Sequence, residues 1–102
     1  GDYVDSAVSG SEVQRHKPHP DIYLHTAHIL GVRPEECVVI EDSPAGVSAA
    51  RAAGMRVIRY AAGSSPNDIG EADYLVSDMA EVTLPLLEKL ASGVVITDAD
   101  AR

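Results

Sequence analysis

Short apolar runs alternate along the chain with longer segments that have helical periodicity. Residues 37–40 (Cys-Val-Val-Ile) are continuously apolar, which favours a strand buried on both faces of a parallel sheet. Residues 56–60 and 74–76 predict two further strands, and residues 4–8 predict a short one near the start.

Three segments between and after these strands predict helices. The first covers about residues 20–30 and ends at Gly31, a residue suited to a helix C-terminus. The second follows Ser43 as a capping residue and covers about residues 44–53, and the third covers about residues 83–91. Strands that alternate with helices predict a three-layer α/β fold with a parallel sheet.

Size and charge narrow the class of protein. The 102 residues suffice for one domain, and 16 acidic against 8 basic residues make the net charge −8. This balance, with four Tyr and no Trp or Phe, argues against a nucleic-acid partner. A lone cysteine, Cys37, and the lack of any apolar run of membrane-spanning length predict a cytoplasmic protein with no membrane partner.

The adjacent acids Glu41 and Asp42 are the sharpest chemical feature. They end the apolar run, and ligands of parallel sheets bind outside the carboxyl ends of strands. Paired carboxylates suit Mg²⁺, although one acid could cap a helix while the other is solvated. The following Ser43–Gly46 turn opens a helix whose amides could attract phosphate; ordinary helix-to-sheet packing is the alternative.

Basic and histidine side chains supply further candidates. Lys17, flanked by His16 and His19, could neutralise a phosphate group, although a loop lysine is usually a solvated surface residue. Three polar residues share one face of the first helix, at positions i, i+4 and i+7: Asp21, His25 and His28. They could bind zinc or nickel, but a polar outer face is the preferred interpretation.

Three motifs taken together resemble one family: Lys17-Pro18-His19-Pro20-Asp21, then Glu41 to Gly46, then Ala52-Ala53-Gly54-Met55. Residues 1–91 look like the second half of a haloacid dehalogenase-superfamily hydrolase, of the subgroup that includes phosphatases and β-phosphoglucomutase-like enzymes. The resemblance implies that Lys17 is a catalytic residue that binds phosphate and the nucleophile. It also implies that Glu41 and Asp42 bind Mg²⁺ and that Ser43 and Gly46 contact the phosphorylated substrate.

The activity that this resemblance implies is magnesium-dependent phosphoryl transfer from a small phosphorylated metabolite through an aspartyl-phosphate. The family's nucleophile motif, Asp-x-Asp, its first two core strands and its cap do not precede Gly1. We therefore expect a partial Rossmann-like core, the C-terminal half of a longer enzyme, followed by a tail at residues 92–102. A non-catalytic fragment, a partner-binding module and a sugar-phosphate mutase remain alternatives.

The tail carries its own signal, because the β-branched run at residues 94–97 is followed by Asp98-Ala99-Asp100. If this strand entered the vacant central slot of the sheet, Asp98 would stand at the nucleophile position and Asp100 at the acid–base position. A surface or disordered tail is the preferred interpretation. Residues 37–40 would then have a bare apolar edge, which predicts self-association or binding of a complementary half-chain.

Overall fold

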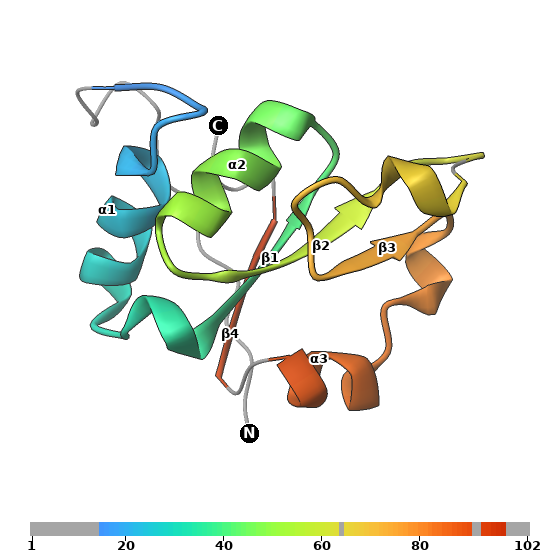
Figure 1. The fold of residues 1–102 in the computed structure, drawn as a ribbon. Helices are drawn as coiled ribbons and strands as arrows, with labels where there is room; N and C mark the ends of the chain where they lie inside the picture. The colour runs from blue at the N-terminus through green and yellow to red at the C-terminus, as the bar shows by residue number, and fades with distance from the viewer. Residues whose placement is uncertain (1–14, 64, 91–92, 98–102) are drawn as a thin grey trace.

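The computed structural model describes residues 15–63, 65–90 and 93–97. The strand expected at residues 4–8, together with Asp98 and Asp100, lies outside these residues. Four parallel strands form one sheet in the order β3-β2-β1-β4 (Figure 1). Their bounds are β1 (Cys37–Glu41), β2 (Arg56–Tyr60), β3 (Tyr74–Val76) and β4 (Val94–Thr97). The prediction of an α/β fold with a parallel sheet is confirmed.

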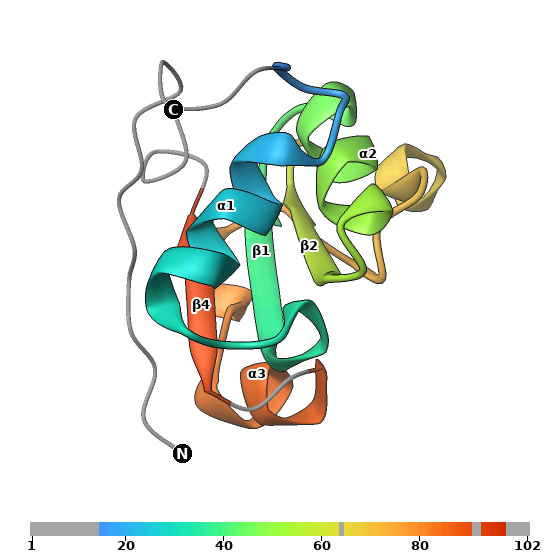
Figure 2. The same ribbon diagram turned by 90° about the vertical axis from the view of Figure 1, so that its left-hand side faces the viewer.

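Helices cover both faces of the sheet. They are α1 (Asp21–Leu30), α2 (Pro44–Ala52) and α3 (Leu84–Leu90), with short 3-10 helices η2 (Pro34–Glu36), η3 (Pro66–Ile69) and η4 (Met79–Glu81). The first two helices lie side by side on one face, and α3 lies against the other (Figures 1 and 2). In the described ranges, no helix has the length and apolar character needed to cross a membrane.

The local signals in the sequence set the helix ends. Ser43 caps α2, because its Oγ accepts a hydrogen bond from the Gly46 amide at 3.0 Å, and Pro44 occupies the first helical position. Helix α1 ends at Gly31, whose φ of 68° lies in the left-handed region that glycine adopts without strain.

The core consists of two apolar clusters, one on each side of the sheet. Val39 and Val57 pack beneath α1 and α2, whereas Val38, Ile58 and Val95 pack beneath α3. Successive residues of a strand point to opposite faces, so β1 is buried on both sides. This arrangement explains the uninterrupted apolar run at residues 37–40.

Strand β4 overturns the preferred interpretation of the tail. Val94–Thr97 pairs in parallel with β1, in a register that runs from Cys37 opposite Val94 to Ile40 opposite Thr97. The first three residues of β4 are buried, so a surface tail is wrong for this segment. The bare edge expected at residues 37–40 is wrong as well. Pairing satisfies backbone groups along β1 and buries a β-branched run, and a solvated tail would do neither.

Candidate functional site

The candidate site lies where β1 ends and α2 begins, at the carboxyl end of the sheet. Residues 15–20 pass close to the start of α2 at this same end (Figure 2). The Nζ of Lys17 therefore reaches Oε2 of Glu41 at 2.9 Å, although the two residues are 24 positions apart. The structure thus brings together the lysine and the first acid that the sequence singled out.

The Glu41 carboxylate is fully buried and is surrounded by donors. Its Oε2 accepts hydrogen bonds from Lys17 Nζ and, at 2.5 Å, from the Tyr23 hydroxyl. Its Oε1 accepts from the Asp42 amide at 3.1 Å, the Ser43 amide at 3.3 Å and the Ser43 hydroxyl at 3.1 Å. A buried charge is tolerated when it is paired and hydrogen-bonded in this way, so Glu41 fixes the loop and the lysine together.

Gly46 makes room for this carboxylate. A Cβ at position 46 would lie 1.9 Å from Cδ of Glu41, so the Glu41 side chain could not keep its position beside any residue other than glycine. Ser43 connects the two residues, since its Oγ accepts from the Gly46 amide and donates to Glu41. The Ser43–Gly46 turn therefore holds the Glu41 carboxylate in place. The contact of this turn with phosphate stays a prediction.

Lys17 is held from two sides. Its ammonium lies 5.3 Å from the centroid of the Tyr23 ring, within the range of a cation–π contact, and it pairs with Glu41. The lysine side chain nevertheless keeps 20% of its surface exposed, so a ligand at this edge could reach the ammonium. His16 and His19, which flank it in sequence, are exposed.

The acids at this edge differ in what they offer a metal ion. Asp42 is exposed, whereas Glu41 is buried and engaged through both oxygens. A hard carboxylate oxygen on Asp42 fits Mg²⁺, which binds through one or two carboxylates together with water and phosphate oxygens. Within the described ranges, no group of three or more His, Cys, Asp or Glu side chains could hold a metal ion. This finding goes against zinc or nickel on the face of α1, where Asp21 pairs instead with Arg15 at 3.0 Å.

Two residues at this edge were not predicted from the sequence as part of the site. The sequence predicted Tyr23 only as part of the first helix, yet its hydroxyl donates a hydrogen bond to Glu41. A buried tyrosine hydroxyl normally has a hydrogen-bond partner, and this rule is the signal that could have found it. Arg59 lies on β2 directly beside Glu41 in the register of the sheet. Nothing in its local sequence marks it, because only strand pairing brings it to this position.

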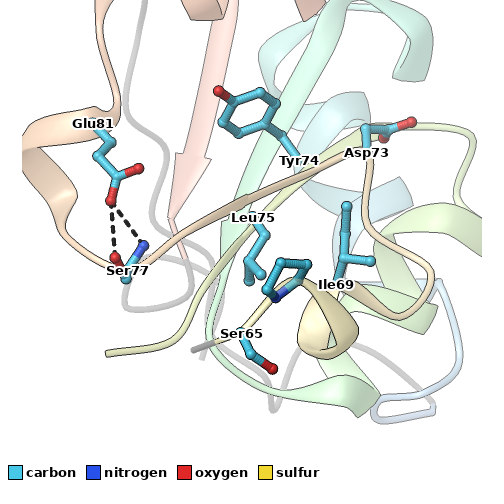
Figure 3. Close-up of a pocket in the computed structure, with 8 residues that line it drawn as sticks. Ser65, Ile69, Asp73, Tyr74, Leu75, Ser77 and Glu81 are labelled. Carbon is cyan, nitrogen blue, oxygen red and sulfur yellow. Dashed lines mark hydrogen bonds between the residues drawn. The ribbon is translucent and has the colours of Figure 1, made fainter. Parts of the chain in front are cut away.

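The structure also has an open cavity of about 370 Å³ at the far edge of the sheet, along β3. Ser65, Leu75, Ser77 and Glu81 are among the residues that line it (Figure 3). The Glu81 carboxylate is already bound there by the amide and hydroxyl of Ser77, at 3.0 and 3.1 Å. None of the predicted site residues lines this cavity, so we place the candidate site at the end of β1.

A parallel α/β sheet with a part-buried lysine–carboxylate pair at the end of an inner strand has the architecture in which ligands generally bind outside the carboxyl ends of the strands. The family of haloacid dehalogenase-like hydrolases matches residues 1–54, and the chain belongs to this family. The resemblance carried by the lysine, the acidic pair and the turn after it is thereby confirmed.

Individual proteins agree with this assignment. Hexitol phosphatase A of Escherichia coli is 42% identical over 77 residues, which are 76% of this chain and 36% of that protein. The structure of CbbY from Rhodobacter sphaeroides in complex with phosphate superimposes with a TM-score of 0.69 at 37% identity, over 78% of this chain and 36% of CbbY. β-Phosphoglucomutase from Clostridium difficile gives a TM-score of 0.70 at 26% identity, over 79% and 35%. The chain thus spans about a third of the length of these relatives.

Proposed function

We propose that this chain is part of a magnesium-dependent phosphatase that acts on a small phosphorylated sugar or sugar alcohol. The observation that carries the proposal is the part-buried Lys17–Glu41 pair beside the exposed Asp42, at the end of the sheet where ligands bind. The similarity to hexitol phosphatase A supports the substrate class. The structural similarity to β-phosphoglucomutase favours a sugar-phosphate mutase as the second candidate.

Each residue of the site has a distinct role in this proposal. The ammonium of Lys17, oriented by Glu41, contacts the phosphoryl group and offsets its negative charge. Asp42 would bind Mg²⁺ directly, and Glu41 would act on the ion through water because both of its oxygens are occupied. When bound, the ion supplies further neutralisation of charge on the transferred group.

The nucleophile is the part of the proposal that depends on β4. Thr97 pairs with Ile40, so β4 ends at the same end of the sheet as Glu41, and Asp98 is the next residue in the sequence. We assign Asp98 as the nucleophile: its carboxylate oxygen attacks phosphorus while the bond to the leaving alkoxide breaks. Asp100 donates a proton to that alkoxide and then accepts one from the water that hydrolyses the aspartyl-phosphate.

Release of inorganic phosphate from a hexitol phosphate, with Mg²⁺ and with EDTA, tests this proposal. We expect the parent chain to release phosphate with Mg²⁺ but not with EDTA. The variants Asp42→Asn and Asp98→Asn should release none. Asp78→Asn, at the start of η4, is a matched control that should keep the activity.

Borohydride reduction followed by mass spectrometry locates the acyl-phosphate. Label at Asp98 supports the assignment, whereas full activity of Asp98→Asn contradicts it. Conversion of a hexose 1-phosphate to its 6-phosphate without phosphate release would favour the mutase.

A further inference from the structure

Arg59 differs from every other arginine in the described part of the chain. The others each pair with a carboxylate: Arg15 with Asp21, Arg33 with Glu35 and Glu36, and both Arg51 and Arg56 with Asp73. The Nε of Arg59 is buried and has no hydrogen-bond partner among the described residues. In a chain with twice as many acidic as basic residues, Arg59 forms no ion pair with any acid of the described residues.

Strand pairing places Arg59 at the candidate site. It is the partner of Glu41 across the β1–β2 pair, where neighbouring strands lie about 4.8 Å apart. Residues two apart in a strand share a face, and Val57 belongs to the core cluster beneath α1 and α2. The side chain of Arg59 therefore starts on the same face of the sheet as Glu41, whose own oxygens are taken by Lys17 and the loop.

A buried guanidinium donor without an acceptor is unfavourable, because its hydration has been lost and nothing replaces it. Carboxylate and phosphate groups match the planar fork of arginine and bind it through two parallel hydrogen bonds. We propose that Arg59 binds an anionic oxygen group of the ligand, a phosphate or a carboxylate. This inference rests on the proposed function for its setting and narrows its substrate class to phosphorylated sugars or sugar alcohols with a second anionic group besides the phosphoryl group at Lys17, so that a hexitol phosphate fills only part of the site.

Anion binding can be measured without Mg²⁺ and without turnover. We would titrate ¹⁵N-labelled protein with inorganic phosphate and, in a separate arm, with acetate, and follow the arginine Nε–H signals by NMR. The Arg59 signal is the one that disappears in Arg59→Lys. We expect phosphate to shift it saturably, and Arg59→Gln to weaken phosphate binding by about tenfold or more, as loss of a charged bidentate contact would. A response to acetate as well would show that any oxyanion suffices.

Arg56→Gln is the matched control, since Arg56 lies on the same strand but pairs with Asp73 at the opposite end. It should leave phosphate affinity unchanged. Equal affinity of Arg59→Gln and the parent would overturn the inference, as would shifts confined to Lys17 and residues 41–46. If Arg59→Gln does not fold, the Nε–H signal of the parent decides alone. Failure of phosphatase activity alongside a saturable Arg59 response would reject the proposed function and leave this inference standing.

Discussion

The two ends of the sheet each hold a carboxylate that gathers several donors. At the amino end, Asp73 accepts from Arg51 at 3.0 Å, from Arg56 at 3.4 Å and from the Val57 amide at 2.8 Å. At the carboxyl end, Glu41 accepts from Lys17 and from groups of its own loop. The number of hydrogen bonds therefore does not separate a structural contact from a contact at the candidate site.

The surroundings of the two carboxylates do separate them. The arginine side chains that bind Asp73 are 45% and 57% exposed, so water can replace them at little cost. Glu41 is fully buried, and its partner Lys17 keeps only 20% of its side chain exposed. Asp73 ties α2 and β2 to the start of β3. Glu41 instead holds an ammonium at the edge where ligands of parallel sheets bind.

Removal of each carboxylate tests this contrast most strongly. Glu41→Ala leaves the Tyr23 hydroxyl and two loop amides without their acceptor, and we expect a loss of about 4 kcal/mol in the free energy of unfolding. Asp73→Ala should cost less, about 2 kcal/mol, because its arginines remain hydrated and only the part-buried Val57 amide loses its acceptor. Urea denaturation of both variants measures the difference, and equal losses would contradict the distinction drawn between the two ends.

Crowding at Gly46 should give the next largest effect. Gly46→Ala places a methyl group 1.9 Å from Cδ of Glu41 and forces that side chain out of its position. We expect the free energy of unfolding to fall by about 3 kcal/mol, which is at the upper end of the usual cost of overpacking a core. The double variant Gly46→Ala with Glu41→Ala removes the clash, so its loss should be smaller than the sum of the two single losses. Simple additivity would show that Glu41 does not occupy this space.

The amino end of β1 makes a pH-dependent prediction. Burial, followed by the charges of Glu36 and Glu35, raises the pKa of the Cys37 thiol from 9.0 to about 11. The unfolded chain therefore loses this proton first, so the stability that is present below pH 9 falls as pH rises toward 11, by up to about 2 to 3 kcal/mol. Urea denaturation at pH 8 and pH 10.5 gives the difference in the free energy of unfolding between the parent and Cys37→Ala. The change of this difference with pH isolates the contribution of the thiol. A constant difference would contradict the raised pKa.

The smallest effect concerns the Tyr23 hydroxyl. Tyr23→Phe removes one donor to the buried Glu41 carboxylate and should cost about 2 kcal/mol, as expected for a hydrogen bond to a charged group. Tyr74→Phe is the control, since Tyr74 is 43% exposed, and its stability should equal that of the parent. Thermal denaturation of both variants decides whether Tyr23 supports the carboxyl end in this way.

Several elements were predictable because their signals act over a few residues. The apolar run at 37–40 predicted β1, Ser43 and Pro44 predicted the start of α2, and Gly31 predicted the end of α1. The residues alone left the predicted roles of Lys17 and Glu41 open, and only the family resemblance favoured phosphate and metal binding over the alternatives. Their contact joins positions 24 residues apart, and no local pattern encodes such a distance.

The amino-acid sequence by itself determined the class of the fold, the ends of its main helices and the acidic pair after β1. Only the tertiary structure decided that β4 pairs with β1, that Tyr23 binds Glu41 and that Arg59 lies beside it. The physical reason is that propensity and capping depend on neighbouring residues, whereas strand pairing is a competition among all available edges. Burial of Val94, Val95 and Ile96 against β1 settles that competition, and it becomes visible only when the whole sheet is assembled.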